Sequence, residues 1–144
     1  MIKEIKGFHG EYRWLSNFWP AEVVLVNDSF PTAEHAYQAS KCYLPGDYLL
    51  ILMAKTPGEA KKLGRKVKIR DDWESIKLQI MESVVRYKFT KNKDLGKKLV
   101  ETGDAYIEET NNWGDCYYGV CNGKGENHLG KILMKVRSEL AVQP

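Results

Sequence analysis

The feature of this sequence that most constrains its fold is a helical apolar pattern between positions 73 and 87. Five apolar or aromatic residues recur there every three or four positions: Trp73, Ile76, Ile80, Val84 and Tyr87. This spacing predicts one apolar face on a helix that ends near Phe89, with Asp71 or Asp72 as its N-cap. A face of that length has to be covered by other parts of the same domain.

Shorter strand and helix patterns lie on either side of this helix. Strands are predicted at 2–8, 21–26 and 105–109, and Asn27 with Asp28 turns the second of them into a hairpin. Helices are predicted at 32–43, where Pro45 is expected to stop the first of them, at 47–54, from Thr56 onward, at 91–101 and at 127–140. The fold class is therefore α+β, a mostly helical single domain with a small antiparallel sheet.

Length and composition are typical of a soluble protein with one domain. The 144 residues suffice for one core, so we expect a single domain over 1–144. The longest apolar run, "YLLILMA" at 48–54, is far shorter than the roughly 18 residues that a membrane-spanning helix needs, and it is expected to lie in the core. The amino terminus has no signal-peptide pattern, which predicts a cytoplasmic location. The net charge of +3 permits an anionic ligand.

The stretch "FPTAEHAYQASK" at 30–41 is the first candidate site. Thr32 is a good N-cap, and a helix starting there places Glu34, Tyr37 or Gln38, and Lys41 on one stripe. Glu34 has two interpretations: an acid that offsets the helix dipole, or a carboxylate in a cleft. In either case the dipole favours the ionised form, which suits a base or an electrostatic stabiliser.

Metal sites are not supported by the spacing of possible ligands. His35 would need a second histidine four residues on, where the chain has Ala39. Cys116, Cys121 and His128 match no common zinc pattern, so buried small thiols are the favoured interpretation of these cysteines. With Cys42 they form an odd set that predicts free thiols in a reducing compartment.

Two further stretches each allow two interpretations. In "EETNNWGDCYYG" at 108–119, Asp115 beside Trp113 and Tyr118 is either a carboxylate next to an aromatic binding wall or part of a loop whose rings plug the core. In "IRDDW", Arg70 either grips a phosphate or is a solvated charge.

Together these stretches resemble the NADAR or YbiA-like family of N-glycosidases. The resemblance rests on ordered motifs that span nearly the whole chain: "LSNF" at 15–18, "AEHAYQASK" at 33–41, "RDDW" at 70–73 with Met81 and "KF" at 88–89, "TGD" at 102–104, and "EETNNWGDCYYG" leading into "GENHLGKILMKVR". It implies a mostly helical α+β fold of the YbiA-like type and hydrolysis of an N-glycosidic bond to ribose. Implied substrates are ADP-ribose on guanine in nucleic acid and phosphorylated ribosylamino-pyrimidine intermediates of riboflavin synthesis.

The resemblance also implies roles for particular residues. It makes Glu34 and Asp115 the acidic, catalytic candidates, with Lys41 and Trp73 beside them. Our hypothesis from the chemistry of the reaction is that Glu34 stabilises an oxocarbenium-like ribose and activates water, while Asp115 orients the water or the ribose hydroxyls. The candidate substrate-binding residues are Asn17, Gln38, Lys41, Arg70, Trp73, Trp113 and Tyr118, with the aromatic rings stacking and the cations, Arg13 included, holding phosphate. No metal or redox cofactor is expected. Relatives commonly have Trp where this chain has Tyr118, which retains stacking but affects substrate preference.

Two other functions remain open. The same aromatic and basic residues would serve a module that binds ADP-ribose or a nucleotide without cleaving it. Alternatively, the lysines of "KLGRKVK" at 62–68 and "KNKDLGKK" at 91–98 would bind nucleic acid directly, with affinity that falls steeply with salt.

Overall fold

The predicted hairpin forms and leads directly into the first helix. In the computed structural model, which describes residues 2–142, β2 (Pro20–Leu25) pairs antiparallel with β3 (Asp28–Thr32). Val23 lies opposite Phe30 in this ladder, and both side chains are buried. The hairpin therefore contributes one apolar face to the core of its unit.

The helix α1 (Ala33–Ser40) begins where β3 ends. Thr32 caps it as predicted, because its hydroxyl oxygen accepts the backbone N–H of His35 at 3.1 Å. The helix is shorter than predicted and ends three residues before Tyr43. Every residue from Ala33 to Ala39 is buried, so α1 is a core helix whose polar side chains have to find partners inside the protein.

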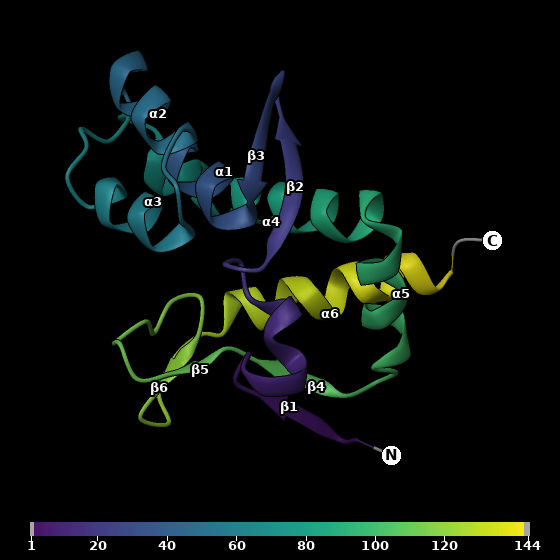
Figure 1. Cartoon of the computed structure of the whole chain (residues 1–144). Coiled ribbons are helices and arrows are strands. Elements are labelled where there is room, and N and C mark those ends of the chain that lie inside the picture. Colours follow the sequence, from purple (N-terminus) through teal and green to yellow (C-terminus); the bar gives the residue numbers. More distant parts are fainter. Residues whose placement is uncertain (1, 143–144) are drawn as a thin grey trace. The chain divides into compact units, whose positions relative to one another are not determined.

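Two short helices pack against α1 and against each other: α2 (Pro45–Leu52) and α3 (Pro57–Gly64). Figure 1 shows both of them next to α1. Pro45, which was expected only to stop the preceding helix, also opens α2, because proline fits the first helical turn, where its missing N–H is not needed. Thr56 caps α3 as predicted, accepting the N–H of Glu59.

The prediction that the run "YLLILMA" lies in the core holds for Tyr48, Ile51, Leu52 and Ala54, which belong to the core cluster or pack against it, and is wrong for Leu49, Leu50 and Met53. Ile51 and Ala54 are buried, whereas Leu50 is 61% exposed and Met53 72% exposed. The reason is that α2 is a two-turn helix with one face against its neighbours, so an apolar run around the helix necessarily places some residues on the outer face. Within residues 2–142, no helix has both the length and the apolar character required to cross a bilayer.

The predicted long helix is confirmed as α4 (Trp73–Lys91). It starts directly after Asp72, and its residues Trp73, Val84 and Phe89 are buried, while Ile76, Ile80 and Tyr87 are partly buried. One buried residue breaks the apolar pattern. Lys88 is fully buried, and this burial lowers the pKa of its ammonium group to about 7 from the ordinary 10.5.

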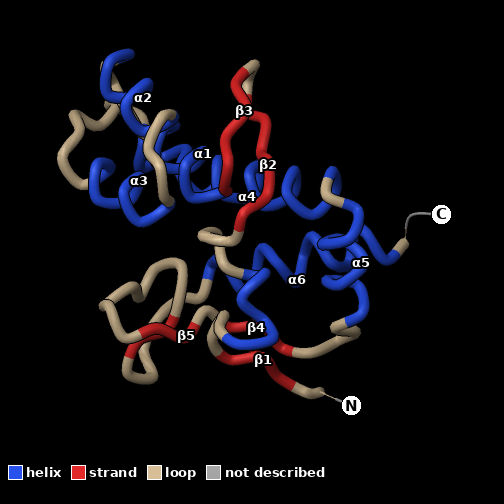
Figure 2. Tube along the Cα trace, viewed as in Figure 1, coloured by secondary structure: helices blue, strands red, loops and turns tan. Residues whose placement is uncertain are grey.

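The remaining strands pair in parallel. β1 (Glu4–Lys6) lies beside β4 (Tyr106–Glu108), and β5 (Thr110–Asn111) beside β6 (Val120–Cys121), drawn in red in Figure 2 where they are visible. The helix α6 (His128–Ala141) packs on β4 and on α5 (Lys93–Glu101). A 3₁₀ helix, η1 (Gly10–Leu15), lies between β1 and β2 along the chain and buries Trp14 and Leu15.

These elements confirm the α+β class, and the predicted antiparallel pairing holds for β2 and β3. The chain divides into two compact units, one formed by Met1–Ser16 with Phe89–Pro144 and the other by Asn17–Lys88. The first contains β1, η1, α5, α6 and the strands β4 to β6. The second contains the hairpin, α1 to α3 and most of α4.

The exposure pattern of α2 gives a first prediction. Ile51→Ala should lower the free energy of unfolding by about 2–5 kcal/mol, because it leaves a cavity in the core. Leu50→Ala, one position earlier on the same helix, should change it by less than about 0.5 kcal/mol. Urea denaturation of both variants measures the difference, and equal losses would contradict this assignment of faces.

Lys88 gives a second prediction, which concerns pH. Between pH 7 and about 10.5 the unfolded chain binds a proton at Lys88 that the folded protein does not, so wild-type stability rises with pH in this window. Lys88→Met removes this titration, so the stability of the variant relative to the wild type should fall by an amount on the order of a few kcal/mol between pH 7 and about pH 10. Denaturation at several pH values measures it. A stability difference between the two proteins that does not change with pH would show that Lys88 does not titrate in this window.

Candidate active site

Three predicted site residues lie on successive turns of α1. Glu34 is in the first turn, Gln38 is one turn later, and Lys41 follows the last helical residue. Glu34 is 8% exposed and Gln38 7% exposed, and the side-chain amide of Gln38 donates a hydrogen bond of 2.7 Å to Oε2 of Glu34. Glu34 is therefore not a solvated acid at a helix end but a buried carboxylate with a neutral donor placed on it.

Lys41 supplies a positive charge to this group. Burial lowers the pKa of its ammonium group, the negative charge of Glu34 works in the opposite direction, and Arg65 lowers it further. Since Lys41 is only partly buried, it retains access to solvent or ligand. The carboxylate, amide and ammonium predicted to share a stripe thus form one electrostatic group.

His35 fixes the start of α1 and is not placed as a metal ligand. Its Nε2 lies 3.0 Å from the carbonyl oxygen of Ala54, and its Nδ1 lies 2.8 Å from the Thr32 hydroxyl. A carbonyl oxygen can only accept, so Nε2 carries the proton and Nδ1 accepts from Thr32. Both ring nitrogens are thus used within the protein, and the ring ties the first turn of α1 to the end of α2.

Asn17 holds the same turn from another direction. Its backbone carbonyl oxygen accepts the backbone N–H of Glu34 at 3.0 Å, which satisfies a donor that the helix leaves unpaired. Its side-chain amide donates to the sulfur of Met81 at 3.4 Å, and the residue is buried. Asn17 thus positions the backbone of Glu34, whatever it does for a ligand.

The aromatic residue predicted for ligand stacking, Trp73, packs against a residue that the sequence did not single out for this purpose. The ring of Tyr37 lies 5.1 Å from that of Trp73, centroid to centroid, at an interplanar angle of 57°. Both side chains are buried. Trp73 is therefore a buried residue that packs against α1 through Tyr37.

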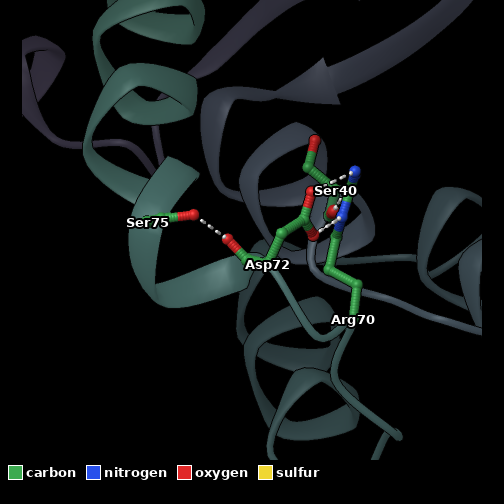
Figure 3. A network of polar contacts seen from close by, with 4 residues as sticks. All are labelled: Ser40, Arg70, Asp72 and Ser75. Carbon is green, nitrogen blue, oxygen red and sulfur yellow. Dashed lines mark hydrogen bonds and ion pairs between the residues drawn. The ribbon is translucent and has the colours of Figure 1, made fainter.

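Arg70 lies at the other end of α1. Its backbone N–H bonds to the carbonyl of Lys41, and its guanidinium donates to both carboxylate oxygens of Asp72 and, at 3.4 Å, to the carbonyl of Ser40 (Figure 3). The hydrogen bond from Arg70 lowers the pKa of Asp72. An open hollow of about 360 Å³ adjoins this pair. A phosphate bound there would compete with Asp72 for the guanidinium.

The remaining predicted residues lie in the other unit: Arg13 in η1, and the others around the loop 111–119. One oxygen of Asp115, Oδ1, accepts the backbone N–H groups of Tyr117 and Tyr118 at 3.1 and 2.9 Å. The backbone of Asp115 pairs with the side-chain amide of Asn111 through both its N–H and its C=O. Asp115 thus shapes this loop with one oxygen.

The aromatic residues of this loop do not all plug the core. Trp113 is 57% exposed, while Tyr118 is partly buried with its ring 4.7 Å from that of Tyr117. Of the two interpretations, the exposed ring favours an aromatic binding surface. Glu34 and Asp115 belong to different units.

The cysteines differ in their surroundings. Cys121 is buried as expected, but Cys116 is exposed, so the prediction of a buried thiol is wrong there. The three thiols are free, as predicted. His128 contacts the ring of Tyr117 and lies 3.3 Å from a carboxylate oxygen of Glu126. Across residues 2–142, no three side chains of His, Cys, Asp or Glu gather as a metal ion would require.

Gly64, at the end of α3, was not identified from the sequence, and it lies against Gln38 and Lys41. Tyr37 was identified only as one of two candidates for the stripe with Glu34, and its ring packs on Trp73. A signal for Gly64 existed, because a lone glycine within a helical pattern often marks a close approach. It was overlooked because its neighbours, "KLGRK", stand out by charge.

Comparison with known protein families shows which family the chain matches. The NADAR domain model matches residues 6–141, which run through both units. The chain belongs to the NADAR family. The predicted resemblance is thereby confirmed, and the motifs around Glu34 and Asp115 both lie within the matched region.

Individual relatives agree with this assignment. An N-glycosidase of Nostoc punctiforme is 39% identical over 135 residues, which cover 90% of this chain and 86% of that protein. A riboflavin biosynthesis protein of Vibrio vulnificus is 35% identical over 133 residues, covering 88% of this chain but 35% of that longer protein. The NMR structure of the Escherichia coli protein YbiA matches with a TM-score of 0.88 at 32% identity, covering 99% of this chain and 88% of that one.

The geometry of Asp115 gives a third prediction. Asp115→Asn retains an oxygen at the Oδ1 position and should leave the free energy of unfolding within about 0.5 kcal/mol of the wild type. Asp115→Ala leaves the N–H groups of Tyr117 and Tyr118 without their acceptor and should cost about 1–3 kcal/mol. Chemical denaturation compares the two variants. Equal stability of both would mean that the loop does not depend on this carboxylate.

Proposed function

We propose that this protein is an N-glycosidase that hydrolyses the bond between ribose and a nitrogen of its substrate. The observation that carries the proposal is the buried Glu34 carboxylate, with the Gln38 amide at 2.7 Å and the charge of Lys41 nearby. The names of the Nostoc and Escherichia coli relatives, both N-glycosidases, support the reaction class. The predicted cytoplasmic location belongs to this proposal and is consistent with three free thiols.

The chemistry follows from what a departing nitrogen leaves behind. As the bond from the anomeric carbon to nitrogen breaks, the ribose gains oxocarbenium character, which a nearby negative charge stabilises. A water molecule then adds to the anomeric carbon and gives its proton to Glu34. Glu34 passes this proton on to the leaving nitrogen, directly or through solvent, which restores the carboxylate. Glu34 can do both because it is buried, where its charge interacts strongly with the cation.

The other residues serve binding in this proposal. Asp115 orients the water or the ribose hydroxyls through the oxygen that does not shape the loop, and Trp113 and Tyr118 supply ring surfaces for the base or sugar. Lys41 and Arg70 hold phosphate, and Arg70 does so by exchanging or sharing its contact with Asp72. No cofactor takes part in these steps.

Two substrate classes fit the proposal and share the bond that is cleaved. The Vibrio relative is named for riboflavin biosynthesis, which supports a phosphorylated ribosylamino-pyrimidine. The net charge of +3 supports the second class, ADP-ribose attached to guanine in DNA or RNA, where the substrate is polyanionic.

The proposal predicts that Glu34→Gln lowers the rate of hydrolysis by about a hundredfold or more, because it removes the charge while retaining the size of the side chain. Wild type and variant are incubated with guanine-ADP-ribosylated DNA and with the ribosylamino-pyrimidine phosphate, and the released base or amine is measured by mass spectrometry. Glu74→Gln, which changes an exposed acid on α4, is the control and should be fully active.

The outcomes of this experiment separate the functions. A folded Glu34→Gln protein with wild-type turnover would refute the role of Glu34. Return of both substrates intact by the wild type, with ADP-ribose retained on the protein, would instead identify a binding module.

A further inference from the structure

One polar atom of Gln38 has no hydrogen-bond partner. Its Oε1 is the one buried side-chain nitrogen or oxygen within residues 2–142 that lacks one. The orientation of the amide explains this: its NH₂ group donates to Glu34, so its oxygen has to point away from the carboxylate. An unsatisfied buried acceptor is costly, and proteins rarely retain one without a functional reason.

What lies against this oxygen is Gly64, the last residue of α3. A Cβ atom on Gly64 would be 2.0 Å from Oε1 and 2.8 Å from Cδ of Gln38, and 3.3 Å from Cε of Lys41. The first two distances are far below van der Waals contact. The side chain of Gln38 can therefore keep its present position only because residue 64 has no side chain.

We propose that Gly64 is a positioning residue that acts through Gln38 to hold the Glu34 carboxylate in the orientation that catalysis requires. This inference rests on the proposed N-glycosidase function and adds to it a residue on another helix that controls the same site. Any side chain at position 64 displaces the Gln38 amide from Glu34, and the carboxylate loses a donor that fixes its orientation.

Gly64 is not required for the backbone. Its φ angle lies outside the positive range that favours glycine, and alanine is the better residue within a helix. The atoms that a methyl group would displace are the end of a flexible side chain, which can move, and not backbone. A displaced Oε1 can also gain the partner that it now lacks. Stability and activity are thus expected to respond in different ways.

The test is Gly64→Ala in the full chain. We expect unfolding at or above the wild-type denaturant midpoint, kcat lowered about tenfold or more, and KM changed by less than about threefold, because Arg70, Trp113 and Tyr118, which are proposed to bind the substrate, are not among the residues that the methyl group would meet. Gly58→Ala is the matched control on the same helix, since its Cβ would meet only the Thr56 hydroxyl at an ordinary 3.9 Å. It should be as active as the wild type.

A double variant isolates the route through Gln38. In a Gln38→Ala background there is no side-chain amide to displace, so adding Gly64→Ala should cause no further loss of kcat. A further loss of tenfold in that background would overturn the inference. So would a Gly64→Ala protein that fails to fold, because Gly64 would then serve packing, or one with wild-type kcat.

A spectroscopic measurement separates this inference from the proposed function. The side-chain NH₂ resonances of Gln38 should shift when Glu34→Gln is introduced into the wild type and should not shift when it is introduced into Gly64→Ala. This readout needs no turnover. If the wild type cleaves neither substrate, the proposed function fails while the NMR comparison still decides whether Gly64 controls the contact between Gln38 and Glu34.

Discussion

Burial of α1 on all sides is the constraint on which the rest of the site depends. A helix surrounded by other elements cannot leave its polar side chains to water, so Glu34, His35 and Gln38 have to be paired within the protein. His35 is satisfied by Thr32 and by the carbonyl of Ala54, and Gln38 donates to Glu34. The electrostatic attraction between the acidic Glu34 and the basic Lys41 is strengthened by the same burial.

These pairings distinguish buried polar residues that hold α1 in place from the carboxylate that can interact with a ligand. Both ring nitrogens of His35 and the backbone carbonyl of Asn17 form contacts that hold the first turn of α1. The Glu34 carboxylate is held by neighbours but remains a charge that can respond to a ligand. This arrangement leaves Oε1 of Gln38 without a hydrogen-bond partner. It avoids a steric clash at that oxygen only because Gly64, which lies against it, has no side chain. Preorganisation of this kind is what electrostatic catalysis requires.

The loop that carries Asp115 solves a similar problem by other means. Here two backbone N–H groups bind the carboxylate and an asparagine side chain binds the backbone of the same residue, so hydrogen bonds within the loop set the position of Asp115. The exposure of Trp113 beside it leaves an aromatic face available. The apolar outer face of α2, with Leu50 and Met53, shows that exposed apolar residues on this protein are not confined to the predicted site.

The sequence by itself determined the features that depend on residues near one another in the chain. Helical spacing placed α4, capping residues placed α1 and α3, the hairpin followed from its turn, and ordered motifs identified the family and the stripe of Glu34, Gln38 and Lys41. Only the tertiary structure decided the parallel pairing of β1 with β4, the exposure of Leu50, the contact of Arg70 with Ser40 and the approach of Gly64 to Gln38. The physical reason is that local hydrogen bonding and side-chain periodicity are encoded over a few residues, whereas the covered face of an element depends on segments far away in the sequence.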